Sequence, residues 1–306
     1  MCSSAGGSEF RLQPDDRIAL VGGEGMVAAG ECGYLELLLT CAMPERRLRF
    51  RTLAWEGDTV FEQFRDLNFP AIEAQLDKIG ATVVIAQFGA MESFAGKGKL
   101  PEFLAAYEKL IDRLRADGKR RVIIVSPSES GDPHQAQPPQ ADRLYKADAI
   151  AMRARERVLE DYAAALQHLA EKKNCAFVDL TFPGVTETQT QRDGVHLDDH
   201  GQQVAALAFC SRLSPELKNA AAKIPSAALR ADNPLLQLVR AKNRLWFHYW
   251  RPQNWAFLNG DRTAQPSSRD HLDPSKRWFP DEIEQFVPLI EAKEREIDAL
   301  AKTLSK

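Results

Sequence analysis

Short apolar segments alternate along this chain with longer segments whose apolar residues recur at helical spacing. Residues 18–21 form an unbroken apolar run, and 81–88 has the composition of a strand buried on both faces. Residues 47–54 instead alternate charged and apolar side chains, which is typical of an edge strand. Together with two similar runs, these predict five strands: residues 18–21, 47–54, 81–88, 121–126 and 175–180.

Segments with a helical pattern separate and follow these strands. We predict helices at residues 26–39, 61–78, 101–116, 147–172, 199–213, 235–250 and 281–304. Strands that alternate with helices of this length favour a parallel, doubly wound sheet with right-handed crossovers. We therefore expect a flavodoxin-like, three-layer α/β/α domain, followed by a C-terminal loop-and-helix extension.

The composition changes along the chain at two places. Residues 1–15 begin with small and polar side chains, which are typical of a disordered N-terminus or of residues left by cloning. We expect the α/β domain to occupy residues 16–225, because the pattern of strands and helices ends there. Residues 226–306 would form the extension, in which the stretch 251–279 is dense in aromatic and polar residues without any periodicity.

The bulk composition is that of a globular chain with no basic excess. Its 306 residues are 44% hydrophobic and 27% charged with a net charge of −3, which argues against nucleic-acid binding. No apolar run approaches the roughly 20 residues of a membrane helix. Five scattered cysteines favour thiols in a reducing compartment over a disulfide scaffold. The location stays open between the cytoplasm and, if an export signal was removed, the periplasm; the oligomeric state is equally open.

Glycine turns follow three of the predicted strands, at the sheet edge where parallel α/β proteins commonly place their chemistry. The first turn is the sharp one: Gly22, Gly23 and Gly25 surround an acidic residue, Glu24. The residues of interest on the three turns are Gly23 and Glu24, then Gly57, then Gly89, Met91 and Glu92.

A fourth segment brings in a candidate base. Asp193 lies three residues before His196, in a loop that leads into a predicted helix. A carboxylate in this position can orient an imidazole so that it accepts a proton. Following three glycine turns on parallel strands, this pair indicates a catalytic site.

In this arrangement the chain resembles the SGNH (GDSL-type) hydrolase family over roughly residues 16–213. In that family a serine after the first strand is the nucleophile, and an Asp-x-x-His pair completes the triad. The resemblance implies that Gly57 supplies an oxyanion-hole amide and that Asp193 and His196 are the orienting acid and the base. Segments at 33–36, 55–60, 88–96, 251–257, 260–263 and 265–271 resemble a divergent subgroup of the Planctomycetes and Verrucomicrobia type, which is thought to act in carbohydrate breakdown.

The chain departs from the family pattern at two decisive positions. Glu24 stands where the family has its serine, and Met91 stands where the family has an oxyanion-hole asparagine, with Glu92 beside it. Loss of the serine removes the acyl-enzyme route. Loss of one oxyanion donor typically costs ~10²–10³ in rate. Ordinary serine-esterase chemistry is therefore not expected.

Three functions stay open. Glu24 and His196 could hydrolyse a carbohydrate or its ester, either by activating water or by direct attack of the Glu24 carboxylate. The same fold could bind a glycan without turnover, with Glu24 acting only as a favourable charge at a helix N-terminus. Gly23, Gly25 and Ala28 also fit a G-x-G-x-x-A dinucleotide fingerprint, which would indicate an oxidoreductase, although the expected acidic residue is missing at the end of the second strand.

The extension carries a further hypothesis. Its tryptophans could simply pack against the main domain, or its aromatic and polar groups could recognise a sugar. In the second case Arg262 and His271 would return over the sheet edge and line the pocket near His196. We expect a small-molecule or carbohydrate substrate and no cofactor. No metal is expected either, because His196 and His200 lack the glutamate of a metalloprotease helix.

Overall fold

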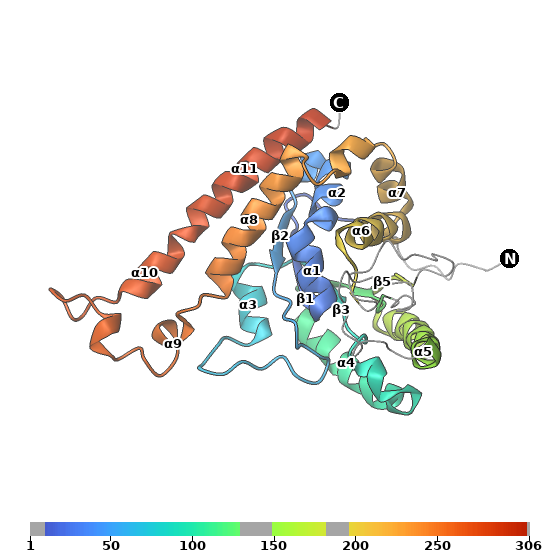
Figure 1. Cartoon of the computed structure of the whole chain (residues 1–306), viewed down its shortest axis with the longest axis horizontal. Coiled ribbons are helices and arrows are strands. Elements are labelled where there is room, and N and C mark those ends of the chain that lie inside the picture. The colour runs from blue at the N-terminus through green and yellow to red at the C-terminus, as the bar shows by residue number, and fades with distance from the viewer. Residues whose placement is uncertain (1–9, 129–148, 182–195, 305–306) are drawn as a thin grey trace.

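The computed structural model describes residues 10–128, 149–181 and 196–304, and its centre is a five-stranded sheet (Figure 1). The strand order is β2-β1-β3-β4-β5, and every neighbouring pair is parallel. The strands are β1 (Arg17–Gly22), β2 (Arg49–Thr52), β3 (Val83–Gln87), β4 (Arg121–Val125) and β5 (Ala176–Val178). The five predicted strands and the α/β fold class are thus confirmed.

Successive side chains of each strand enter two separate cores, as expected when a sheet is covered on both faces. Ile18 and Leu20 of β1 enter one core, and Ala19 and Val21 enter the other. The helices over the first face are α1 (Glu24–Cys32), α2 (Tyr34–Ala42), α6 (Asp199–Leu213) and α7 (Pro215–Ala221). The helices over the second face are α3 (Ile72–Lys78), α4 (Leu100–Arg115) and α5 (Ala149–Lys173). Short 3₁₀ turns are η1 (Pro44–Arg46), η2 (Glu92–Ala95), η3 (Lys97–Lys99), η5 (Ser226–Leu229) and η6 (Pro266–Ser268).

Two predicted helices differ from the structure. The helix expected at 26–39 is divided into α1 and α2 at Gly33, whose φ of 75° ends one helix in the left-handed region that glycine tolerates. The helix expected at 61–78 is wrong over its first part, because only α3 is helical there. Leu67 and Asn68 both have φ of 56°, and Pro70 follows, so the segment before α3 is an extended loop.

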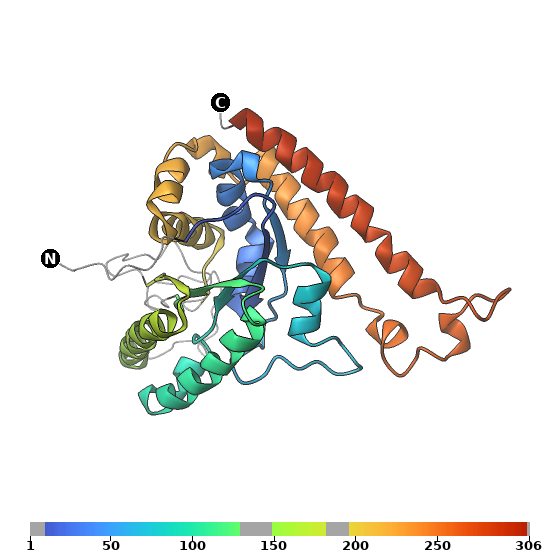
Figure 2. The ribbon, with the colours of Figure 1, turned by 180° about the vertical axis from the view of Figure 1, so that it is seen from behind.

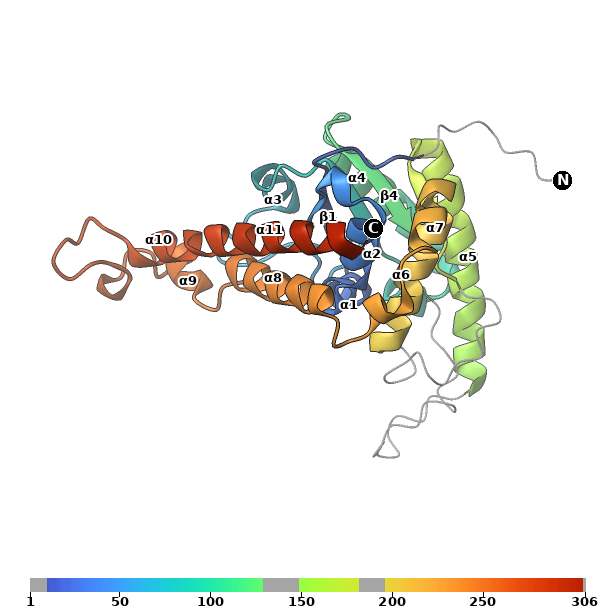
Figure 3. The same ribbon diagram turned by 90° about the horizontal axis from the view of Figure 1, so that it is seen from above.

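The extension is a helical hairpin that packs along the β2 edge of the sheet. It consists of α8 (Pro234–Trp250), α9 (Trp255–Leu258), α10 (Trp278–Glu284) and α11 (Phe286–Leu304). Figures 1 and 2 show α8 and α11 side by side next to β2 and α2, and in Figure 3 α9 and α10 lie at the end of the molecule opposite α5. Leu235, Val239 and Ile297 are buried in the same core as α1 and α2, so the hairpin contributes to the main core.

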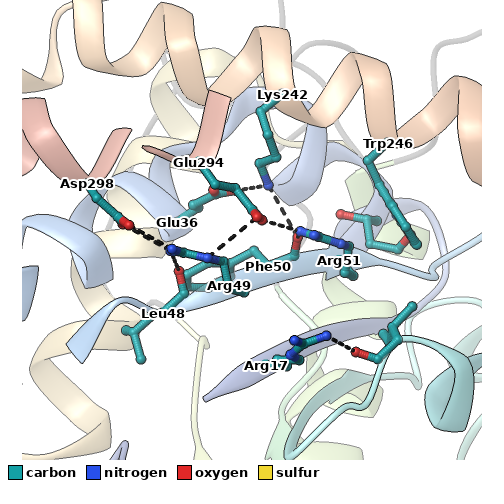
Figure 4. A network of polar contacts seen from close by, with 12 residues as sticks. Arg17, Glu36, Leu48, Arg49, Phe50, Arg51, Lys242, Trp246, Glu294 and Asp298 are labelled. Atoms are coloured by element: carbon teal, nitrogen blue, oxygen red, sulfur yellow. Dashed lines mark hydrogen bonds and ion pairs between the residues drawn. The ribbon is translucent and has the colours of Figure 1, made fainter. Parts of the chain in front are cut away.

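Ion pairs attach this hairpin to the edge strand (Figure 4). Arg49 of β2 pairs with Asp298 at 2.6 Å, and Arg51 pairs with Glu294 at 2.6 Å. Lys242 of α8 is fully buried and donates to Glu36 of α2 at 2.9 Å. Charged, inward-turned side chains on an edge strand that a helix covers leave no open edge for another strand to pair with.

None of the helices in the described part of the chain combines the length and the apolar character that a membrane span requires. The four described cysteines are free thiols, and Cys41 and Cys210 are buried. Burial raises the pKa of Cys41 to about 11 and that of Cys210 to about 12, so both stay protonated near neutral pH.

Candidate functional site

A pocket opens at the carboxyl ends of β1 and β3, where α1 begins. Glu24 and His196, from opposite ends of the α/β domain's sequence, both line it. Six predicted site residues lie on this pocket: Gly23, Glu24, Gly89, Met91, Glu92 and His196. The structure therefore brings together the first turn, the third turn and the late histidine, as the sheet-edge argument predicts.

The sharp turn after β1 places Glu24 at the N-terminus of α1. Gly22 has φ of 150° and Gly23 is the helix N-cap, with no side chain capping the first turn. Glu24 is the first helical residue and is half-buried in the pocket wall. The first backbone N–H groups of a helix have no acceptor within it, and they carry partial positive charge. This end of α1 therefore suits a carboxylate, a bound anion or a developing oxyanion.

Glu92 connects the third glycine turn, after β3, to the second, after β2, through hydrogen bonds. Its two carboxylate oxygens accept from the backbone N–H of Val60 at 2.8 Å and of Gly89 at 2.9 Å, and its side chain is buried. The Gly89 amide is thus already engaged by Glu92. Met91 lies beside it with 55% exposure and offers no side-chain N–H donor. The third turn contributes shape to the pocket, and the N-terminus of α1 offers backbone donors for an oxyanion.

Asp58 is a pocket residue that the sequence pattern alone would assign to helix capping. Its carboxylate pairs with the guanidinium of Arg65, the residue is only 4% exposed, and its backbone oxygen lies beside Gly23. Burial raises the pKa of Asp58 to about 6, although the Arg65 cation opposes this shift. A carboxyl group that titrates near neutral pH inside a pocket is a candidate proton donor or acceptor. Its position after a glycine turn is the sequence signal that could have found it.

Tyr34 lines the pocket and is held in place by Asp199. The Tyr34 hydroxyl donates to Asp199 at 2.7 Å, and Arg240 of α8 pairs with the same carboxylate at 2.5 Å. Burial, followed by the Asp199 carboxylate, raises the pKa of Tyr34 to about 12, so the hydroxyl keeps its proton. Asp199 begins α6, three residues after His196. This network therefore anchors the segment that presents the histidine.

Arg155 and Phe94 form the outer rim. The guanidinium of Arg155 lies 4.2 Å from the centre of the Phe94 ring, which is 60% exposed, and donates to the carbonyl of Ala90 at 3.3 Å. Burial lowers the pKa of Arg155, although an arginine still carries its charge at neutral pH. The rim thus offers a flat aromatic face with a cation behind it. Neither residue was predicted, because their proximity depends on the packing of α5 against η2.

The serines nearest the third and fourth strand ends have different roles. Ser93 donates to the Ala90 carbonyl at 2.7 Å, and Ser126 is fully buried and bonded to Asp179 at 3.1 Å. Both of these hydroxyl groups are structural. Ser128, just beyond β4, does line the pocket and was missed by the sequence reasoning.

Three predicted site residues lie elsewhere. Gly57 is an exposed turn residue with open space around its α-carbon, and its neighbour Asp58 takes its place in the pocket wall. Arg262 and His271 are exposed in the segment between α9 and α10, which Figures 1 and 3 show far from α6. The hypothesis that they line the pocket near His196 is therefore wrong.

Local packing explains where this segment goes. The Trp255 indole N–H donates to the Leu67 carbonyl at 3.0 Å, and the Asn68 amide donates to the Asn259 carbonyl at 3.0 Å. The Trp255 ring also packs at a tilt against Phe69, with 4.2 Å between ring centres. These contacts hold the extension against the loop before α3. Trp255 thus packs against the main domain, which is the first of the two interpretations of the tryptophans given above.

Asp193 lies outside the described residues. Within the described ranges, no group of three or more histidine, cysteine or acidic side chains is arranged to hold a metal ion.

Comparisons with known proteins agree with this fold. Residues 20–204, more than half of the chain, match the model of a family described as the GDSL-like lipase/acylhydrolase family. No curated protein matches the chain. Among solved structures, BT4096, a gut microbial diltiazem-metabolizing enzyme, is similar with a TM-score of 0.60 at 11% identity, over 98% of this chain and 97% of that one. Est24, a carbohydrate acetylesterase from Sinorhizobium meliloti, is similar with a TM-score of 0.44 at 12% identity, over 71% of this chain and 100% of that one.

Proposed function

The chain belongs to the GDSL-like lipase/acylhydrolase family, and we propose that this hydrolase cleaves acyl esters of a carbohydrate with a carboxylate–histidine pair instead of a serine nucleophile. One observation supports the proposal: Glu24 and His196 line a single pocket. The resemblance to the family implies that they stand where its members have the serine and the histidine. Family membership and the sheet order β2-β1-β3-β4-β5 argue against the dinucleotide-binding alternative, whose fold has the order 3-2-1-4-5-6.

The proposed reaction uses water as the nucleophile. His196, with Glu24 nearby, takes a proton from water while the water oxygen bonds to the ester carbonyl carbon. The negative charge then forms on the carbonyl oxygen at the N-terminus of α1, where the dipole and the backbone N–H groups favour it. Collapse of this intermediate breaks the bond to the sugar oxygen, which takes up the proton from His196.

The carbohydrate part of the proposal rests on two observations. One is the resemblance to the divergent subgroup. The other is the character of the pocket rim, where Phe94 presents an exposed ring backed by Arg155. Aromatic faces with adjacent planar hydrogen-bonding groups suit the apolar faces and hydroxyl groups of sugars.

A second candidate function, glycan binding without turnover, is favoured by the third turn. The Met91 side chain cannot donate, and Gly57 is not among the described residues that line the pocket, so two oxyanion donors that the family resemblance implies are missing. The two functions make opposite predictions for turnover.

The test is hydrolysis of acetylated sugars, p-nitrophenyl acyl esters and p-nitrophenyl glycosides by four proteins: wild type, His196→Ala, Glu24→Gln and Ser128→Ala. We expect ester hydrolysis whose kcat/KM falls about 10²-fold or more in the first two variants and stays unchanged in Ser128→Ala. A pre-steady-state burst is not expected, because the water route forms no acyl-enzyme. A burst that disappears in Ser128→Ala would replace this mechanism with a serine route. Binding without turnover would support the second function.

A further inference from the structure

A second cavity, of about 450 Å³, lies between α1 and α8. Its α1 residues are Val27, Gly30 and Glu31, which form a different face of that helix from the residues that line the catalytic pocket. Thr52 and Ala54, at and just after the end of β2, also line it, and most of the other lining residues belong to α8. We call it the α1–α8 cavity.

Cationic groups dominate the α8 wall of this cavity. Arg240, Arg244 and Arg251 all line it, against a single acidic lining residue, Glu31. Arg240 is held by Asp199 at 2.5 Å and Arg251 by Glu56 at 3.0 Å, so both guanidinium groups are fixed in place. Arg244 is exposed, and its side chain forms no hydrogen bond or ion pair with the described residues 10–128, 149–181 and 196–304. It is the group that can meet a ligand anion without breaking an internal contact.

Aromatic side chains complete the same wall. Trp246, Phe247 and Trp250 line the cavity, and Phe247 is 37% exposed with the Arg251 guanidinium 5.0 Å from its ring centre. Asn243 donates to the Gly30 carbonyl at 2.8 Å, which holds α8 against α1 at the base of the cavity. The wall therefore combines flat apolar faces with planar, forked donors in a fixed arrangement.

From this combination we propose that the α1–α8 cavity binds an acidic sugar unit, one whose ring carries a carboxylate or a sulfate group. Arg244 would pair with the anionic group, and the exposed Phe247 ring would cover one apolar face of the sugar. The cavity has the size of a small-ligand site, and the net charge of −3 disfavours a long polyanion such as nucleic acid. This binding requires no turnover and does not depend on the ester chemistry of Glu24 and His196.

Tryptophan fluorescence reports on this site directly, because Trp246 and Trp250 line the α1–α8 cavity, whereas the described lining of the catalytic pocket contains no tryptophan. The full chain would be titrated with trigalacturonate as a carboxylate sugar, a sulfated disaccharide, neutral maltotriose and sodium sulfate, and calorimetry would confirm each Kd. We expect one acidic sugar to change the fluorescence and to bind at least tenfold more tightly than maltotriose, and the pair of acidic probes distinguishes carboxylate from sulfate recognition.

Variants test the assignment to this wall. Arg244→Ala should weaken binding roughly tenfold, since it removes a hydrogen bond between charged groups. Phe247→Ala should also weaken it. Arg295 is an exposed arginine on α11, outside the α1–α8 cavity, and Arg295→Ala should leave Kd unchanged. His196→Ala, in the catalytic pocket, should also leave Kd unchanged, so a failure of the proposed ester chemistry can be told apart from a failure of acidic-sugar binding. Equal binding of acidic and neutral sugars, equal Kd in Arg244→Ala and wild type, or no signal with any probe would overturn the proposal.

Discussion

Lys242 of α8 is fully buried, and its ammonium donates to the Glu36 carboxylate of α2 at 2.9 Å and to the Phe50 carbonyl of β2 at 3.2 Å (Figure 4). This one cation therefore connects the extension, the helix layer and the edge strand. Burial raises the pKa of Glu36 and lowers that of Lys242, and each partner opposes the shift of the other. Each charge thus depends on its partner.

Removing one member of this pair should destabilise the protein strongly. Glu36→Gln leaves the Lys242 charge buried without its carboxylate, and such an uncompensated charge typically costs about 3–5 kcal/mol. Urea unfolding followed by circular dichroism would measure the loss. The double variant Glu36→Gln, Lys242→Met removes both charges and should recover most of it.

The matched control for that prediction is an exposed pair. Lys293 and Glu296 on α11 lie 3.0 Å apart, with side-chain exposures of 33% and 49%. Glu296→Gln should change the unfolding free energy little, because solvent screens such pairs. A small effect of Glu36→Gln, no larger than that of Glu296→Gln, would contradict the role assigned to Lys242.

The turn after β1 should tolerate no side chain at Gly22. This residue has φ of 150°, and a β-carbon there would overlap the backbone oxygen of Gln87 on β3. Both the torsion and the overlap are unfavourable, so Gly22→Ala should cost at least about 2 kcal/mol. Gly57→Ala is the comparison, since open space surrounds Gly57 and its φ is ordinary. Thermal unfolding that shows equal losses for the two variants would refute this account of the turn.

Asp58 predicts a pH dependence of stability. Its folded pKa is raised to about 6 by burial, so the folded chain holds this proton more tightly than the unfolded chain does. The ionisation penalty is absent below pH ~4, grows as the pH rises through the folded pKa, and is complete above it, at on the order of 2–3 kcal/mol. Asp58→Asn removes this titration, and the ion pair with Arg65, which forms only when Asp58 is ionised, is already included in the folded pKa.

The stability of Asp58→Asn relative to wild type should therefore improve by most of that amount between about pH 4 and pH 7.5. Urea unfolding at both pH values measures the difference, and any effect of the substitution that does not depend on pH cancels in it. A relative stability that stays constant across this range would mean that the folded and unfolded pKa values of Asp58 are the same.

Much of the fold was predictable because apolar runs alternate with helical segments. Those patterns reflect burial on both faces of a sheet, and all five strands appear where they were expected. The errors occurred where single backbone conformations decide the outcome. Gly33 divides one predicted helix, and Leu67 and Asn68, both at positive φ, keep another from forming before Ile72.

The site was predictable only as far as strand ends determine it. Glu24 and His196 line one pocket because parallel strands deliver their carboxyl ends to one edge of the sheet. The roles of Asp58 and Arg155 depend on contacts between loops and helices distant in sequence, which no local pattern contains. The placement of Arg262 and His271 depends on the packing of Trp255 against Phe69, another long-range contact.

The extension should also influence the chemistry of the pocket through Arg251. Its guanidinium lies 3.7 Å from the centre of the Trp55 ring and pairs with Glu56 at 3.0 Å, and the other cation on the same ring is Arg65, 4.2 Å away, which holds Asp58. Both cations lower the pKa of Asp58, and Arg65 has the larger effect. Loss of either positive charge should therefore raise that pKa further.

We expect the pKa of Asp58, followed by carboxyl-carbon NMR, to rise most in Arg65→Gln, less in Arg251→Gln, and not measurably in Arg251→Lys, which keeps the charge. The Asp58→Asn protein identifies the resonance. If Asp58 in Arg251→Gln titrates as in wild type while its pKa shifts in Arg251→Lys, Arg251 acts on Asp58 through its packing on Trp55. That result would contradict an electrostatic link between the extension and the pocket.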